Sequence, residues 1–511
     1  MMPSSSSSSY SQPDVPPEPS ITPVTAGRTY KDYSEYYAYN TSCTPSTGHA
    51  KILVIPVWFS DSNSYIATGQ KETVRQDIYN VYFGSNEETG WRSVKTYYEE
   101  ESHGALTLDG TVSEWYDTKT SSSSYASEST GSDRTMSLAT TASDWYFKNH
   151  KDEDRKDYDC DGDGYLDGVM LIYAYIDYSH KNYNSSYGNF WAYCYWVQDP
   201  TVKNVEKPGA NAYFWASYDF MYGKNIIINR TGISRSSYAS GDTSHCTIDS
   251  HTFVHEMGHM FGLDDYYDYS QQYNPAGSFS MQDSNVGGHD PFSSFALGWG
   301  EAYIPTETTT INLKPFTQSG EMIILSPSWN QYDSPFDEYF VLEYYTLDGL
   351  NELDTTYSYE NARGKGSSIP GIRLWHVDAR LCYYVMRSEY DYSVYQANTT
   401  DPASAPGPIG LMMSNTYYSS QAQGYLSPMG QSYADYNLLQ LIRNSTTITY
   451  KPTSEFNKND LFIEGDTFTP ASYSKQFVGK NGKLNSGKTL GFNFTVNSIS
   501  DDSASITVTK I

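Results

Sequence analysis

Two apolar runs constrain the fold of this chain most strongly. Lys51–Phe59 (KILVIPVWF) and Gly168–Tyr175 (GVMLIYAY) are rich in β-branched and aromatic residues. A continuous apolar run of this length is too short for a helix that stands alone, and it is typical of a strand buried within a sheet. Both runs are far shorter than the roughly 18 residues that a membrane span requires. We therefore expect two buried strands and no membrane span.

Helices and further strands are predicted around these two strands as far as about residue 300. Apolar residues recur with helical spacing at residues 70–83, 92–102 and 132–148, and residues 105–112 alternate as a strand or hairpin does. Helices alternating with strands are typical of a domain that packs helices against a sheet.

The pattern changes after Thr306. Short alternating segments follow, separated by Gly, Asp, Ser and Asn turns, at residues 309–313, 338–345, 371–377 and 504–510. Such segments favour a β-sandwich. We predict an α+β fold in three parts: a disordered Ser/Pro-rich tether at residues 1–27, a helix-and-sheet domain at residues 28–304, and a β-rich, sandwich-like C-terminal domain at residues 305–511.

The chain is strongly acidic. Its 33 Lys and Arg residues against 60 Asp and Glu residues give a net charge of −27. A surface of this sign repels nucleic-acid phosphates and anionic lipid headgroups, so we do not expect nucleic acid as a partner. Tyrosine accounts for 50 of the 511 residues and must supply part of the core, a composition commoner in β-rich secreted proteins than in cytosolic enzymes.

The N-terminal segment has a composition that cannot bury apolar surface. Residues 1–24 (MMPSSSSSSYSQPDVPPEPSITPV) consist largely of serine and proline. A tether of this kind often follows an export signal or a lipid-anchored cysteine, which predicts a secreted or surface-tethered protein. The alternative is an ordinary disordered tail.

One motif carries most of the chemistry: His255-Glu256-Met257-Gly258-His259. Residues four apart lie on one face of a helix, so both histidines can direct an imidazole at one zinc ion. Glu256 would lie beside the metal without binding it, which is the position of a general base that activates water. The alternative is a surface helix that contains this pattern by chance.

The residues around the motif extend the prediction. Gly262 and Asp265 stand at the eighth and eleventh places counted from His255. Glycine lets the chain turn sharply off the helix, so that Asp265 can return as a third zinc ligand. Met281 lies at a distance suited to the Met-turn beneath such a site, although a single methionine is more often a core residue. His251 shares the helix face, but a third ligand from the same helix could not easily complete a tetrahedron.

An acidic segment at residues 157–168 (DYDCDGDGYLDG) predicts a second metal site. Its carboxylates follow the pattern D-x-D-x-D-G-x-x-D, at Asp159, Asp161, Asp163 and Asp167. In an EF-hand-like loop these residues bind calcium, and the seventh residue, here Tyr165, adds its carbonyl oxygen. The twelfth position should be a bidentate Glu but is Met170, so calcium would take its remaining ligands from elsewhere or from water. The alternative is an unliganded acidic turn, whose carboxylates would repel one another.

At these residues the chain resembles the immune inhibitor A family of secreted bacterial zinc metallopeptidases, which are metzincin-like. The resemblance covers roughly residues 49–380. Segments similar to family landmarks occur in family order: KILVIPVWFSD at 51–61, SVKTYYEEESHGALTLDGTV at 93–112, PFSSFALGWGE at 291–301, EYFVLEY at 338–344 and GIRLWHVD at 371–378.

The resemblance implies a role for each residue of the site. It implies that zinc is held by His255, His259 and Asp265, that Glu256 is the catalytic acid/base, and that the acidic loop binds calcium. One feature differs: Gln282 and Asp283 follow Met281, whereas some metzincins place a tyrosine two residues after the methionine to stabilise the transition state. Another residue or solvent would then supply that contact.

These observations predict a zinc-dependent endopeptidase with Zn²⁺ and structural Ca²⁺ as cofactors. It would be extracellular and bacterial, either secreted or held at a lipid or cell surface by its N-terminal tether, and it would hydrolyse proteins and peptides. The alternative is a non-catalytic adhesin or glycan-binding surface protein whose tyrosines contact sugars. Glu256 argues against that alternative, because a binding module has no reason to keep the base beside both histidines.

Overall fold

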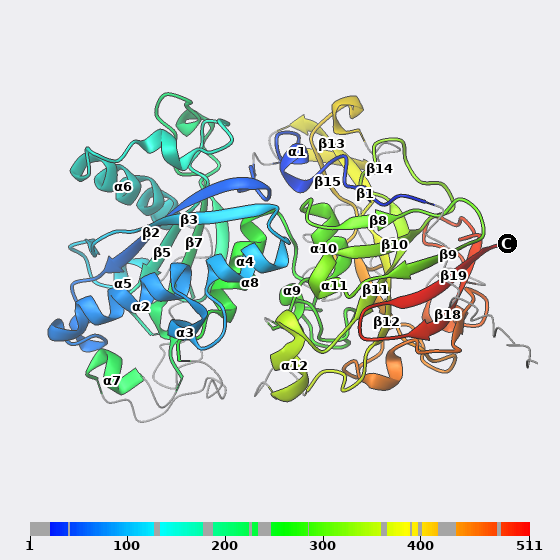
Figure 1. Cartoon of the computed structure of the whole chain (residues 1–511). Helices are drawn as coiled ribbons and strands as arrows, with labels where there is room; N and C mark the ends of the chain where they lie inside the picture. The colour runs from blue at the N-terminus through cyan, green and yellow to red at the C-terminus, as the bar shows by residue number, and fades with distance from the viewer. Residues whose placement is uncertain are drawn as a thin grey trace, which may run out of the picture.

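The structure is a computed structural model that describes residues 21–38, 41–126, 133–176, 188–223, 227–233, 247–284, 286–358, 365–388, 391–396, 401–416, 436–477 and 482–511. These residues form two lobes that lie side by side (Figure 1). Helix α8 lies on the side of the first lobe that faces the second (Figure 1). Most of the predicted tether, residues 1–20, lies outside the described residues.

The first lobe is built around a mainly parallel sheet with the strand order β3-β2-β5-β7-β6, in which β4 also pairs with β2. β6 is antiparallel to β7, and the other pairs are parallel. The strands are β2 (Gly48–Trp58), β3 (Leu106–Val112), β4 (Tyr116–Asp117), β5 (Val169–Tyr173), β6 (Tyr193–Trp196) and β7 (Ala212–Ser217). The strands predicted at 51–59, 105–112 and 168–175 are thus confirmed as β2, β3 and β5.

Helices cover both faces of this sheet. They are α2 (Lys71–Phe83), α4 (Val94–Glu101) and α8 (His251–Met260) on one face and α6 (Asp133–Asn149) on the other. Successive residues of β2 point to opposite faces. Ile52 and Val54 therefore belong to the core beneath α2, α4 and α8, and Leu53 and Ile55 belong to the core beneath α6. The three predicted helices correspond to α2, α4 and α6.

The second lobe contains a six-stranded sheet in the order β1-β8-β10-β11-β12-β16. These strands are β1 (Val24–Thr25), β8 (Glu301–Tyr303), β10 (Glu321–Leu325), β11 (Glu338–Tyr345), β12 (Gly371–Asp378) and β16 (Leu439–Ile442). β1 comes from the N-terminal segment and pairs antiparallel with β8. β8 ends just before the predicted boundary at residues 304/305 and pairs with β10 beyond it.

Two smaller sheets complete this lobe. One has the order β17-β18-β19-β9, with β17 (Thr467–Phe468), β18 (Phe492–Ile499), β19 (Ala504–Lys510) and β9 (Thr309–Leu313). The other has the order β14-β13-β15, with β14 (Asp391–Gln396), β13 (Leu381–Ser388) and β15 (Ile409–Leu411). Ile323 and Phe340 of the six-stranded sheet share one core with Phe494 and Ile506 of the four-stranded sheet.

The remaining helices are short: α1 (Tyr30–Ser34), α3 (Asn86–Thr89), α5 (Ser123–Ala126), α7 (Ile227–Thr231), α9 (Met281–Ser284), α10 (Pro291–Ala296), α11 (Phe316–Ser319) and α12 (Glu352–Thr356). One continuous core joins the lobes, because Phe292 and Phe295 of α10 belong to the same cluster as Phe253 of α8 and Trp375 of β12. The chain thus has mixed α and β content, as predicted. None of its described helices is both long enough and apolar enough to cross a bilayer.

Candidate metal centre

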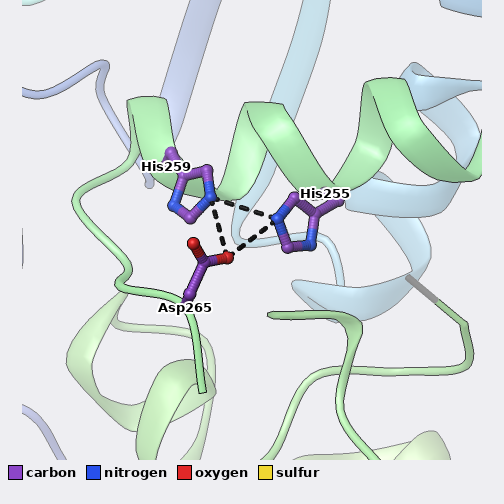
Figure 2. Close-up of side chains that lie close together, drawn as sticks. All are labelled: His255, His259 and Asp265. Carbon is purple, nitrogen blue, oxygen red and sulfur yellow. Dashed lines mark hydrogen bonds and ion pairs between the residues drawn. The ribbon is translucent and has the colours of Figure 1, made fainter. Parts of the chain in front are cut away.

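Helix α8 directs His255 and His259 toward a common point, and Asp265 approaches that point from the loop that follows the helix (Figure 2). The two Nε2 atoms are 3.1 Å apart. Asp265 Oδ1 lies 3.1 Å from Nε2 of His255 and 3.3 Å from Nε2 of His259. In the described part of the chain, this is one of two clusters whose ligand atoms lie close enough together to hold a metal ion.

Hydrogen bonds to the backbone fix which ring nitrogen faces this point. Nδ1 of His255 lies 2.9 Å from the carbonyl oxygen of Met281, and Nδ1 of His259 lies 2.7 Å from that of Leu263. A carbonyl oxygen can only accept, so each Nδ1 carries a proton and donates it. Each Nε2 therefore faces the other ligand atoms and is the nitrogen left for a metal, which is the arrangement of a metal-binding histidine.

Gly262 turns the chain from α8 back to the histidines. Its φ angle is +110°, which residues with a side chain rarely adopt. A Cβ atom at this position would lie 2.8 Å from Cδ1 of Tyr30 and 3.0 Å from Sγ of Cys43. The Leu263 N–H donates to the carbonyl of Gly258, closing the helix end in the pattern that a glycine at this place allows. The turn thus requires glycine for both its dihedral angle and its lack of a side chain.

The Asp265 carboxyl is held in its ionised form. Burial opposes ionisation, but the charge of His259 and hydrogen bonds from both histidines outweigh it and hold the pKa of Asp265 well below its usual range. Burial also opposes protonation of His259, yet the Asp265 charge raises the pKa of His259 to about 10. Metal binding at these atoms would displace the proton that His259 otherwise carries.

Glu256, the residue after His255, has a buried side chain and is not part of the ligand cluster. The backbone N–H of Cys194, in β6, donates to its carboxylate, and Oε2 has no hydrogen-bond partner among the described residues. Burial raises the pKa of Glu256, and the nearby charges of His259 and His255 oppose that rise. The buried carboxylate thus lies within the field of both histidines and Asp265.

Residues 40–289 match the family model described as immune inhibitor A peptidase M6, catalytic domain. The chain thus contains a catalytic domain of this peptidase family. Because the matched range includes α8 and Asp265, the cluster lies within the catalytic domain of a metallopeptidase whose substrates are proteins. A comparison with curated proteins gives no match.

Met281 of the M6 peptidase lies at the start of α9, directly beside His255. Its side chain is fully buried, and its carbonyl oxygen accepts the His255 hydrogen bond. The next residue, Gln282, packs against α8 so closely that a Cβ atom on Gly258 would lie 2.3 Å from its Oε1 atom. The residues that follow Met281 thus support the helix and offer no tyrosine hydroxyl to the cluster.

Tyr269 of the peptidase is a site residue that the sequence analysis missed. Its hydroxyl donates to Oδ2 of Asp265 over 2.7 Å, while Oδ1 of Asp265 faces the histidines. The side chain is 48% exposed, so it lies at the solvent side of the cluster. It stands four residues after Asp265 in a tyrosine-rich stretch, where spacing alone does not distinguish it from Tyr266 or Tyr267.

Two other residues near the motif have different partners. His251 stacks on Trp91 with ring centroids 4.0 Å apart, and its Nδ1 atom lies 2.7 Å from Oδ1 of Asp249, so it is not in the ligand cluster. Asp268 accepts hydrogen bonds from the backbone N–H groups of Ser270 and Gln272 and closes a turn.

The acidic loop of the peptidase contains the second cluster, formed by Asp159, Asp161 and Asp167. Oδ1 of Asp159 has no hydrogen-bond partner in the described chain, whereas Asp167 accepts from the backbone N–H groups of Lys51 and Cys160. Burial raises the pKa of Asp167 to about 7, against these hydrogen bonds.

Lys31, in α1, pairs with two carboxylates of this loop. Its Nζ atom lies 2.6 Å from Oδ2 of Asp161 and 2.7 Å from Oδ2 of Asp163. Asp163 is not part of the cluster, and its Oδ1 atom accepts from the backbone N–H of Tyr165. The positive charge of Lys31 thus neutralises part of the negative charge of the loop.

Proposed function

We propose that this chain is a zinc-dependent endopeptidase in which His255, His259 and Asp265 hold the metal and Glu256 is the general base. The observation that carries the proposal is the convergence of two Nε2 atoms and an ionised carboxylate, with the buried Glu256 carboxylate alongside. A non-catalytic role would leave the position and burial of Glu256 without an explanation.

The donor set fits zinc. Two imidazole nitrogens and one carboxylate oxygen are the ligands of a catalytic zinc site, in which three protein ligands leave one position open. The Nδ1 hydrogen bonds to Met281 and Leu263 orient both rings, as ligating histidines require. Metal analysis of the purified chain should find about one zinc per chain. A chain that binds Mg²⁺ or Ca²⁺ in preference to zinc would contradict the assignment.

When bound, zinc supplies a Lewis acid that polarises a carbonyl and lowers the pKa of water to about 7. Glu256 takes the proton from the attacking water onto its carboxylate and later gives it to the leaving amine. The raised pKa of Glu256, caused first by burial, suits this task because a stronger base holds the transferred proton better. The Cys194 N–H positions the carboxylate while this happens.

The wider assignments belong to the same proposal. The catalytic domain, assigned to residues 28–304, is metzincin-like, and the C-terminal domain, assigned to residues 305–511, is sandwich-like, which is supported by the core that its two larger sheets share. The protein is secreted from a bacterium or tethered at its surface through residues 1–27 and acts on extracellular proteins. Family membership and the composition of the N-terminal segment support this location.

We also propose that the acidic loop binds a structural calcium ion. Asp159, Asp161 and Asp167 would supply carboxylate ligands. The carbonyl oxygen of Tyr165 and a carboxylate oxygen of Asp163 are further candidate ligands. The partnerless Oδ1 of Asp159 supports a cation here, because a buried carboxylate oxygen without a partner is unfavourable. Lys31 would then share Asp161 with the ion.

Calcium should therefore raise the melting temperature of the chain. Binding to the folded state at roughly 100 times Kd adds about 2.7 kcal/mol of stability by mass action. Asp159→Asn combined with Asp161→Asn should abolish the rise, whereas Asp502→Asn, at an exposed turn, should keep it. The measurement is calorimetry with and without calcium at fixed zinc. A full calcium response in the double variant would remove the site from this loop.

Tyr269→Phe should weaken zinc binding while leaving the fold unchanged. The variant removes the hydrogen bond to Asp265 Oδ2, and loss of such an outer partner typically lowers metal affinity about 10- to 100-fold. Competition with a chromophoric chelator measures the change. Tyr79→Phe, at an exposed position of α2, is the matched control. Equal zinc affinities in the two variants would show that the Tyr269 hydroxyl does not support the ligand.

A further inference from the structure

A pocket of about 300 Å³ lies where the metal-binding loop meets the N-terminal segment and the second lobe. Gly262 and Asp264, from the loop that returns Asp265 to the histidines, form one part of its wall. Its volume is at the small end of the range for ligand pockets, roughly 300 to 1,000 Å³, and suits one large side chain. We call it the Asp264 pocket.

Asp264 is the only charged residue among the described residues that line this pocket. No hydrogen bond or ion pair satisfies its carboxylate within the described part of the chain. The nearest lysine in the N-terminal segment, Lys31, donates to the carbonyl of Cys43 and is paired with the acidic loop instead. A carboxylate in a mostly apolar pocket is unfavourable unless a cation joins it.

Two tyrosine hydroxyls lie near this carboxylate without partners. The hydroxyl oxygens of Tyr30 and Tyr37 are buried and make no hydrogen bond to any described residue, and both side chains line the pocket. Burial raises the pKa of both hydroxyls, and the charge of Asp264 adds to the rise, so both lie within its field. A buried hydroxyl without a partner is unfavourable, and a donor group entering the pocket would relieve this cost.

The rest of the wall is aromatic and apolar. It includes Trp196 at the end of β6, Tyr384 of β13, Ile409 and Leu411 of β15, and Met413. Aromatic faces attract cations, and aliphatic walls accept the methylene stem of a long basic side chain. The pocket therefore combines an apolar wall for the methylene stem of a basic side chain with the Asp264 carboxylate for its charged end.

We propose that the Asp264 pocket binds an arginine or lysine side chain of the peptide substrate and so gives the enzyme a preference for basic residues near the scissile bond. This inference rests on the proposed protease function. Asp264 precedes Asp265 in the chain, and the charge of His259 acts on it, so the carboxylate in the pocket lies close to the cluster. A peptide with its carbonyl at the His255, His259 and Asp265 cluster would then place a nearby side chain in the pocket. The guanidinium or ammonium group donates to Asp264 and to the hydroxyl oxygens of Tyr30 and Tyr37.

The test uses pairs of fluorogenic peptides that differ only by arginine or citrulline. Citrulline has the shape of arginine without its charge, and each position on either side of the scissile bond is varied in turn. At one position, the zinc-loaded wild-type chain should show a kcat/KM ratio of arginine to citrulline of about tenfold or more. The ratio should fall to about one in Asp264→Asn at equal zinc content and should stay unchanged in Asp502→Asn, which controls for the acidic surface as a whole.

A binding measurement completes the test without turnover. The zinc-loaded Glu256→Gln chain should bind the arginine peptide more tightly than the citrulline peptide by calorimetry, and Asp264→Asn in that background should remove the difference. Equal ratios at every position in the wild type would overturn the pocket assignment while leaving the protease function intact. A ratio that survives Asp264→Asn would likewise overturn it. If the wild type cleaves neither peptide of any pair nor casein, the proposed function fails and this inference fails with it.

Discussion

Glu256→Gln should retain about one zinc per chain and lose about 10²- to 10⁴-fold in kcat/KM. Glutamine has the shape of glutamate and can accept the Cys194 hydrogen bond, but it cannot take up a proton from water. Because Glu256 lies outside the ligand cluster, its replacement removes no metal ligand. Metal content by mass spectrometry and cleavage of a fluorogenic peptide measure the two effects on the same sample.

The control for this variant is Glu464→Gln, which makes the same chemical change at an exposed position of the second lobe. It should keep both zinc and activity. Loss of zinc from Glu256→Gln would show that Glu256 is a ligand or a structural residue. Full activity in Glu256→Gln would show that another group is the base.

Asp265→Ala should lose zinc and activity together. Its Oδ1 atom is the single carboxylate oxygen within 3.3 Å of both Nε2 atoms in the described cluster. Without it, two imidazoles and water remain, which bind Zn²⁺ poorly. The variant should also lower the pKa of His259 relative to the metal-free wild type, because the Asp265 charge that raises this pKa is gone.

Asp264→Asn and Asp268→Asn are the matched controls for zinc content. Asp264 lines the neighbouring pocket, and Asp268 accepts hydrogen bonds from Ser270 and Gln272, and neither belongs to the ligand cluster. Both variants should retain zinc after gel filtration. Zinc retained by Asp265→Ala but lost from either control would show that the third ligand is a different carboxylate.

Local sequence patterns predicted part of the first lobe, namely β2, β3, β5, α2, α4 and α6, but not β4, β6 or β7. The apolar run at 51–59 is β2, and the helical spacing at 70–83 is α2, because burial on a sheet or along one helix face imposes a regular spacing on the residues concerned. The segments at 309–313 and 504–510 are likewise strands β9 and β19. Their pairing with each other connects residues about 200 positions apart, and no local pattern contains that information.

The cluster of His255, His259 and Asp265 was predictable for a similar reason, since the spacing of four on a helix and the glycine turn after it are local features. Three other features depend on tertiary packing. Tyr269 reaches Asp265 through the path of a loop, Lys31 pairs with a loop 130 or more residues away, and Asp264 lies in a pocket with a wall from the second lobe. Only the folded chain brings these groups together.

The central claim is that the chain cleaves peptide bonds with zinc held by His255, His259 and Asp265. Casein digestion by the zinc-loaded chain, with and without a zinc chelator, tests it most directly. Digestion should stop when the chelator removes zinc and return when zinc is restored. Digestion that continues after the metal has been removed, or no digestion by a folded chain that contains one zinc, would contradict it.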